Sequence, residues 1–213
     1  MKPPRSTTMR LVALLALLLP AGCSSERAQG IRGAEPYRLS GAACLAVLRE
    51  RGIAVGRWQH IPDRSCRVDT PVRAGSGRLA SFVPPLETSC AMLVAWSDFE
   101  AEVNRAARTH LRSPVVAVQH YGSYACRSMT GNAGRASLHA RARALDISGF
   151  RLADGRIVTV HEGWRGTRAE QRFLRAVASA ACRRFSVTLT PESDRRHQDH
   201  LHVDIGPWRQ CGL

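Results

Sequence analysis

Six widely spaced cysteines constrain this chain more than any other feature of its sequence. The 213 residues contain seven cysteines, and one of these, Cys23, directly follows an apolar N-terminal segment. The other six include no Cys-x-x-C pair, which argues against a cysteine-based zinc site and favours three disulfides of open connectivity. They are Cys44, Cys66, Cys90, Cys126, Cys182 and Cys211.

The N-terminus predicts export to a compartment in which disulfides persist. Basic residues precede an apolar run over 11–19, and Ala21 and Gly22 then lead to Cys23. A basic start, an apolar run too short to span a bilayer and small residues after it are typical of a secretory signal. The segment also resembles a bacterial lipoprotein signal. We therefore expect residues 1–22 to be a signal peptide and Cys23 a lipid anchor in the periplasm or cell envelope.

The rest of the chain is expected to form one domain with a small additional lobe. Residues 23–38 are polar, contain glycine and proline, and are typical of a tether. The Pro84-Pro85 pair marks a boundary between an N-terminal lobe over 39–84 and a larger domain over 85–213.

Hydrophobic periodicity predicts an α+β fold. Expected helices cover residues 40–52, 88–111 and 167–185, and expected strands cover 115–118, 144–152, 156–160 and 200–205. An Asp154-Gly155 turn predicts a β-hairpin, and Thr167-x-x-Glu170 is a capping box that opens the last helix. We expect helices packed on a small, largely antiparallel sheet that the disulfides stabilise.

The charge of the chain suits an anionic neighbourhood. Lys and Arg number 31 against 17 Asp and Glu, a formal net charge of +14. Peptidoglycan, or another anionic polymer of the envelope, is the partner that we expect. The arginines are scattered and form no aromatic-interleaved basic stripe, so no nucleic-acid partner is expected. The protein is expected to be a monomer.

The segment His197-Gln-Asp-His-Leu-His-Val-Asp204 gathers three of the eight histidines near the C-terminus. Because side chains alternate along a strand, His200, His202 and Asp204 share one face, and the apolar residues between them share the other. The apolar face can enter the core, which leaves imidazole and carboxylate groups on the opposite face.

A carboxylate in the expected hairpin supplies a partner for these histidines. Asp146 stands between Leu145 and Ile147, and burying an unpaired carboxylate costs several kcal/mol. His139 precedes it by seven residues. Together, His139, Asp146 and His202 offer three ligands and leave a fourth position open, as in catalytic zinc sites. The alternative is a hydrogen-bonded polar cluster without metal.

These motifs resemble known families. Ser-x-His-(six residues)-Asp followed by His-x-His is similar to the zinc D-Ala-D-Ala carboxypeptidases, lysostaphin-type endopeptidases and penicillin-insensitive murein endopeptidases. More narrowly, the chain from Cys44 to Cys211 resembles the bacterial extensin-like C-terminal domain family. The matching segments are Gly122–Arg127, Ser137–Ala140, Ala144–Phe150, Ala181–Phe185 and His197–Asp204. The resemblance implies a D-Ala-D-Ala metallopeptidase-like core in the larger domain.

The resemblance also implies roles at the centre of the site. His139, Asp146 and His202 would hold Zn²⁺. His200 occupies the position of a catalytic histidine, and Asp199 falls where the carboxypeptidases place a glutamate base. Since aspartate is shorter than glutamate, the base stays open between these two residues.

Further residues of the resembling motifs would surround the ligands. Arg127 is similar to an arginine that binds substrate or stabilises the oxyanion. His197 lies where the murein endopeptidases also have a histidine, and Ser137 opens the Ser-x-His pattern. Asp204 shares the strand face of the last ligand and is expected to orient it. The chain departs from the pattern at Ala142, where the superfamily has glycine.

The function that follows is zinc-dependent hydrolysis of an amide bond in peptidoglycan peptides. Zinc lowers the pKa of a bound water to roughly 7 and polarises a carbonyl group. The alternative is a non-catalytic, zinc-stabilised module that binds the cell envelope through its basic surface.

Overall fold

The computed structural model describes Met1 and residues 39–59, 66–129 and 132–213. The predicted lipidation site Cys23, the tether and the signal segment after Met1 lie outside the described residues. Among the helices that the structure describes, none is long and apolar enough to cross a membrane.

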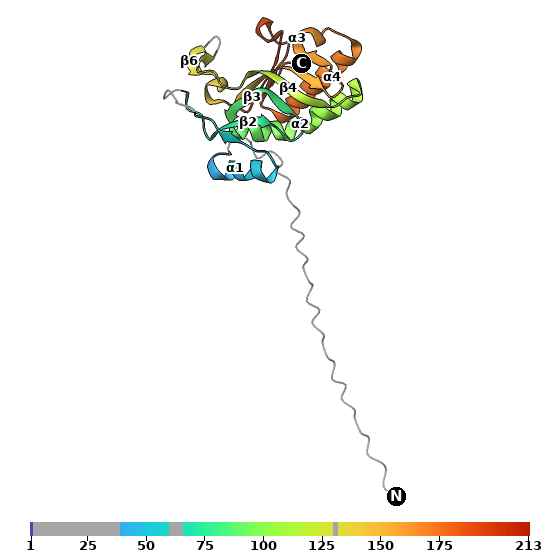
Figure 1. Ribbon diagram of the computed structural model, residues 1–213. Helices are drawn as coiled ribbons and strands as arrows, with labels where there is room; N and C mark the ends of the chain where they lie inside the picture. The colour runs from blue at the N-terminus through green and yellow to red at the C-terminus, as the bar shows by residue number, and fades with distance from the viewer. Residues whose placement is uncertain (2–38, 60–65, 130–131) are drawn as a thin grey trace. The chain divides into compact units, whose positions relative to one another are not determined.

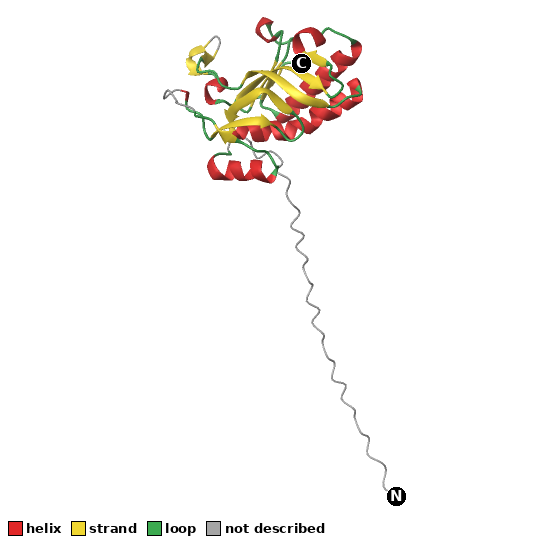
Figure 2. Cartoon of the chain, in the orientation of Figure 1, coloured by secondary structure: helices red, strands yellow, loops and turns green. Residues whose placement is uncertain are grey.

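One large sheet forms the centre of the described chain (Figures 1 and 2). Its strands are β1 (Gly56–Arg57), β2 (Pro71–Ser76), β3 (Ser81–Ser89), β4 (Val115–Gly122), β7 (Ala144–Leu152), β8 (Ile157–Thr159), β9 (Val187–Leu189), β10 (Leu201–Asp204) and β11 (Gln210–Cys211). They pair in the order β1-β2-β3-β4-β7-β10-β9-β11, and β8 also pairs with β7. A separate pair is formed by β5 (Ser128–Met129) and β6 (Asn132–Ala136).

The predicted mixed fold with a largely antiparallel sheet is confirmed. Within the large sheet, only β3 with β4 and β9 with β11 are parallel neighbours. The sheet is larger than the small one expected, with nine strands in the described residues. Beyond the four expected strands, β1, β9 and β11 span only two or three residues each, too few for an alternating pattern to be recognised, whereas β2 and β3 span six and nine residues.

The Pro84-Pro85 pair lies inside β3 and not in a linker. Residues 81–83 pair with β4, while Ser81 and residues 86–89 pair with β2. Proline has no N–H to donate to a strand neighbour, and neither proline is among the residues of β3 that pair with β2 or β4. The predicted N-terminal lobe thus contributes strands to the same sheet as the rest of the described chain.

Helices cover one face of the sheet (Figure 2). The described helices are α1 (Gly41–Glu50), α2 (Cys90–Leu111), α3 (Val160–Gly163) and α4 (Arg168–Arg184), and the chain also has the 3-10 turns η3 (Leu138–Arg141) and η4 (Arg195–His197). The capping box at the start of α4 is present, with the Thr167 hydroxyl and the Glu170 carboxylate each bonded to the other's backbone N–H. Helices α2 and α4 pack side by side and enclose the core.

The apolar face of the last strand enters this core as the alternation predicts. Leu201, Val203 and Ile205 are fully buried, and so are Leu145 and Ile147 of β7. The antiparallel pairing of β10 with β7 sets His202 directly opposite Asp146. The polar residues of both strands therefore share the face that the helices leave open.

The three predicted disulfides are confirmed. Cys44–Cys90 joins α1 to α2, Cys66–Cys126 joins the segments that precede β2 and β5, and Cys182–Cys211 joins α4 to β11. Disulfides persist in oxidising compartments, so they agree with an exported protein.

Glu100 of α2 holds the turn between β2 and β3. Its carboxylate accepts hydrogen bonds from the backbone N–H groups of Arg78, Leu79 and Ala80 at 2.7, 3.0 and 2.7 Å. Only 1% of this residue is exposed. A side chain at Gly77 would meet the same carboxylate, since an added Cβ would lie 2.7 Å from its Oε1.

We predict that Glu100→Gln lowers the free energy of unfolding by about 2 kcal/mol, because the new amide group turns two N–H donors toward donors of the turn. Denaturant unfolding followed by circular dichroism measures the change. Glu87→Gln is the matched control, because Glu87 is exposed and lies 3.8 Å from Arg73. We expect the control to change stability by less than about 0.5 kcal/mol. Equal midpoints for Glu100→Gln and wild type would contradict the prediction.

Candidate metal centre

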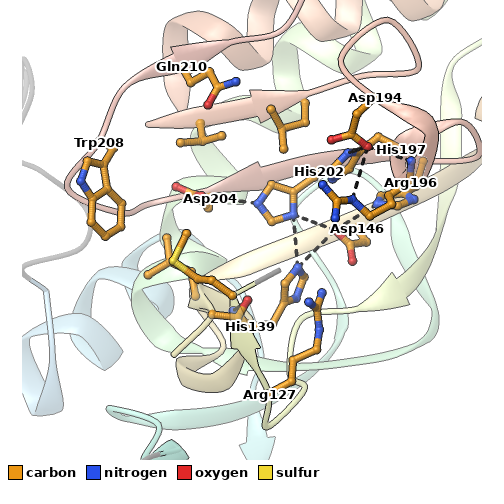
Figure 3. Close-up of a pocket in the computed structure, with 16 residues that line it drawn as sticks. Arg127, His139, Asp146, Asp194, Arg196, His197, His202, Asp204, Trp208 and Gln210 are labelled. Atoms are coloured by element: carbon orange, nitrogen blue, oxygen red, sulfur yellow. Dashed lines mark hydrogen bonds and ion pairs between the residues drawn. The ribbon is translucent and has the colours of Figure 1, made fainter. Parts of the chain in front are cut away.

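Three side chains from separate elements converge on one point of the open sheet face (Figure 3). They are His139 from η3, Asp146 from β7 and His202 from β10. His202 Nδ1 lies 2.9 Å from Asp146 Oδ1 and 3.2 Å from His139 Nε2. His139 Nε2 lies 3.3 Å from the same carboxylate oxygen. The three residues thus form a group that can hold a metal ion.

The spacing of these three atoms fits a small tetrahedral ion. Zinc bonds to nitrogen and oxygen measure about 2.0–2.1 Å, which separates neighbouring ligand atoms in a tetrahedron by about 3.3 Å. The observed separations are 2.9, 3.2 and 3.3 Å. The three atoms can therefore form one face of a tetrahedron with its fourth corner open.

Both histidines turn one ring nitrogen toward the common point. His139 Nδ1 lies 3.2 Å from the carbonyl oxygen of Ser123. His202 Nε2 lies 3.4 Å from Asp204 Oδ2, whose other oxygen accepts from the backbone N–H of Gly206 at 2.9 Å. A carbonyl or carboxylate oxygen only accepts, so these outer nitrogens carry the protons. Metal-binding histidines are held in this way. Asp204 therefore lies in a position from which it can orient His202.

Local structure brings His139 to the sheet. Ser137, the N-cap of η3, accepts a hydrogen bond from the His139 backbone N–H at 3.3 Å. The turn ends at Ala142 in the left-handed region with φ of 50°, a conformation that favours glycine. The Ala142 carbonyl accepts from the backbone N–H and the hydroxyl of Ser89, so the turn is fastened to the start of α2.

His200 and Asp199 form a hydrogen-bonded pair beside this group. His200 Nδ1 lies 2.8 Å from Asp199 Oδ1, and its Nε2 lies 3.6 Å from Asp146 Oδ1. Tyr121 of β4 also donates a hydrogen bond to Asp199 and lies edge-on to the His200 ring. Burial works against ionisation of Asp199, but the bonds from His200 and Tyr121 outweigh it and lower its pKa. Asp199 is therefore ionised at neutral pH.

A cleft of about 420 Å³ surrounds the group and contains the remaining predicted residues. His197 lies in its wall, with Nδ1 2.9 Å from Asp194 Oδ1. Arg127 lies on its rim (Figure 3), next to the Cys66–Cys126 disulfide, and its backbone carbonyl accepts from Ser137 N–H. The structure thus gathers the predicted ligand and catalytic residues at one cleft, except Asp199, which contacts it only through its hydrogen bond to His200.

Four residues of this region have no signal in the sequence. Tyr121 and Asp194 hold Asp199 and His197, while Arg196 and Trp208 line the cleft. Tyr121 and Arg196 directly precede the matched segments Gly122–Arg127 and His197–Asp204, but none of the four belongs to a spacing pattern that marks a ligand or a base. The predicted strand over residues 200–205 is the signal that could have indicated the loops before and after it. These loops carry Asp194, Arg196 and Trp208.

The contacts within the group shift the pKa values of Asp146 and His202. Burial opposes ionisation of Asp146, but hydrogen bonds from His139 and His202 hold its pKa well below the usual value. Burial likewise opposes protonation of His202, yet Asp146 and Asp204 raise its pKa to about 9. In the metal-free protein His202 is therefore an imidazolium between two carboxylates. A metal ion has to displace its Nδ1 proton.

We predict that the metal-free protein loses stability as pH rises from about 6.5 to 9. The folded-state pKa of His202 exceeds its unfolded value, so its contribution is complete below pH 6.5 and vanishes above 9. The loss is up to about 3 kcal/mol. Melting temperatures with a chelator measure it, and added Zn²⁺ is expected to stabilise increasingly over the same range. A chelated protein whose stability is flat over this range would contradict the prediction.

Comparison with known proteins places the chain in a family. No curated protein and no solved structure matches it. The family model described as "Extensin-like protein C-terminus" matches residues 42–212, which include all three candidate metal ligands and all six disulfide cysteines. The chain therefore belongs to the extensin-like protein C-terminus family.

Proposed function

We propose that this protein is a zinc-dependent hydrolase that cuts an amide bond in peptidoglycan peptides. The observation that carries the proposal is the open-sided His139–Asp146–His202 group with the His200–Asp199 pair next to it. Catalytic zinc sites keep three protein ligands and an open position, whereas structural sites are usually closed by four.

The donor set supports zinc as the metal. Two imidazole nitrogens and one carboxylate oxygen suit a borderline ion such as Zn²⁺, while Mg²⁺ and Ca²⁺ prefer oxygen ligands throughout. When bound, zinc supplies an acidified water and a Lewis acid for the scissile carbonyl. We also propose that the β7–β10 pair, which carries two of the three ligands, belongs to a core of the D-Ala-D-Ala metallopeptidase type.

His200 is suited to carry the proton in this reaction. Asp199 can accept the Nδ1 proton of His200, which leaves Nε2, 3.6 Å from Asp146 Oδ1, as the nitrogen that carries a lone pair next to the group. At Nε2 it can take a proton from the attacking water and deliver it to the leaving nitrogen. One C–O bond forms, the C–N bond breaks and an amine leaves. Asp199, already ionised and hydrogen-bonded, serves this role by orienting His200.

Arginines on the cleft rim suit an anionic substrate. Arg127 and Arg196 line the cleft and carry positive charge. A guanidinium can bind a peptide carboxylate with two hydrogen bonds, or stabilise the charge that develops on the carbonyl oxygen. Figure 3 shows the guanidinium of Arg127 extending toward His139, which makes Arg127 a candidate for these tasks. Peptidoglycan peptides carry carboxylates, and the chain as a whole is strongly basic.

The location that we propose is the cell envelope. The disulfides fit an oxidising exported compartment, and the sequence before residue 39 resembles a lipoprotein signal with Cys23 as its anchor. A tethered hydrolase would reach cell-wall peptides directly from the periplasmic side of a membrane.

We predict that the purified protein binds about one zinc ion, and that His139→Ala loses the metal and the ability to cut muropeptides. His139 provides one of three ligands, and its removal leaves too few to retain the ion. Elemental analysis and chromatography of digested muropeptides measure the two effects. His110→Ala is the matched control, since His110 lies on α2 outside the cleft and should change neither. Wild-type protein without metal, purified without chelator, would overturn the zinc assignment.

A second prediction separates catalysis from metal binding. His200→Ala should keep zinc but lower kcat at least about 100-fold, because the proton carrier is lost. Asp199→Asn should lower kcat by about 10-fold and move the pH profile, because His200 loses its charged partner. If the zinc-loaded wild type cuts no muropeptide and His200→Ala changes nothing, the protein is a zinc-stabilised envelope-binding module instead.

A further inference from the structure

A second cleft of about 470 Å³ adjoins the candidate metal centre. Its walls come from β3, β4, β7, the start of α3 and the loop before β10. Asp199 lines this cleft, whereas its hydrogen-bonded partner His200 lines the metal cleft. The His200–Asp199 pair therefore stands between the two clefts, and a ligand that crosses this pair can occupy both.

Strand β7 fixes the distance between the clefts. Asp146 faces the metal cleft and Ser148, two residues further along the same strand face, lines the second one. Two residues of a strand span about 6.6–6.8 Å. This is about the length of two residues of extended peptide, so neighbouring residues of one substrate can reach both clefts.

The two clefts differ in charge. The metal cleft has Arg127 and Arg196 on its rim, in addition to the charge of a bound ion. The second cleft is lined by the carboxylates of Glu162 and Asp199, and no Lys or Arg is among its lining residues. In a chain with 31 basic and 17 acidic residues, such a surface is unusual.

The second cleft offers several hydrogen-bond acceptors beside the rings of His120 and His161. Glu162 is exposed at the start of α3, and no ion pair of its carboxylate is found among the described residues. The hydroxyl of Ser148 and the side-chain amide of Gln119 lie in the same walls. Gly149 leaves room for Gln119, since an added Cβ there would lie 2.8 Å from its Oε1. An ammonium group has three donors and no acceptor, and suits these partners.

We infer that the second cleft binds a primary ammonium group of the substrate, with Glu162 as its main charged partner. The inference rests on the proposed function for the site next to it. It defines the substrate class as a peptide that carries a free amine within about two residues of the bond at the metal centre. The carboxylates of the same peptide lie near Arg127 and Arg196 in the metal cleft. The protein therefore recognises a peptide that carries both positive and negative charges.

The test compares two ligands that differ only in this amine. They are a peptidoglycan stem peptide with a lysine side chain and its Nε-acetyl derivative. Each is titrated calorimetrically into the zinc-loaded full chain. The chain carries His200→Ala, which prevents turnover of the peptide. We expect acetylation to weaken binding about fivefold, as for a partly exposed ion pair. Adding Glu162→Gln should bring the ratio of the two dissociation constants close to one, and adding Glu162→Lys should invert it. Glu50→Gln on α1, outside both clefts, is the matched control and should keep the ratio.

The outcomes separate this inference from the proposed function. Equal binding of the two peptides, no binding of either, or an unchanged ratio in both Glu162 variants would overturn the ammonium site. Each of these results can coexist with cleavage of muropeptides by the wild type, which would leave the hydrolase intact. A ratio that depends on Glu162 in a protein that cuts nothing would support the ammonium site and overturn the hydrolase.

Discussion

The pairing of β10 with β7 is the constraint on which the candidate site depends. It sets His202 opposite Asp146, and the same register buries Leu201 and Val203 against the helices. A slip of one residue would turn every side chain of β10 to the other face, so the imidazoles would enter the core and the apolar residues would meet water. Burial of the apolar face thus selects the one register that assembles the candidate metal ligands. The hydrophobic core and the polar site are two results of a single pairing.

Much of this arrangement could be predicted because the pattern is local. Alternation along residues 200–205 separates polar from apolar side chains, and the isolated Asp146 between two apolar residues indicates the facing strand. The six cysteines predict three disulfides, and the capping box at Thr167 predicts the start of α4. In each case the signal depends on residues that are adjacent or separated by a few positions.

The unpredicted features depend on contacts between distant segments. The cysteine pairing follows from the path of the whole chain, as Cys66 and Cys126 show. Strand β3 contains two prolines yet pairs with β2 on both sides of them, which no strand pattern expresses. The partner of Asp199 comes from β4, far away in the sequence. The sequence left Asp199 and His200 as rival bases. Their hydrogen bond favours one unit in which the carboxylate orients the ring.

The protonation of the group explains why its residues tolerate close packing without an ion. Two imidazole nitrogens and a carboxylate oxygen within 3.3 Å would place lone pairs against one another if all were unprotonated. The proton held by His202 at neutral pH satisfies them and keeps the pocket in the geometry that a metal ion requires. Asp204 stabilises both states, since the outer nitrogen of His202 donates to it with or without the inner proton. Proton and metal thus compete for one position, and the fold is preorganised for either. The same competition predicts tighter metal binding as pH rises through neutrality, which is the range in which a zinc hydrolase would act.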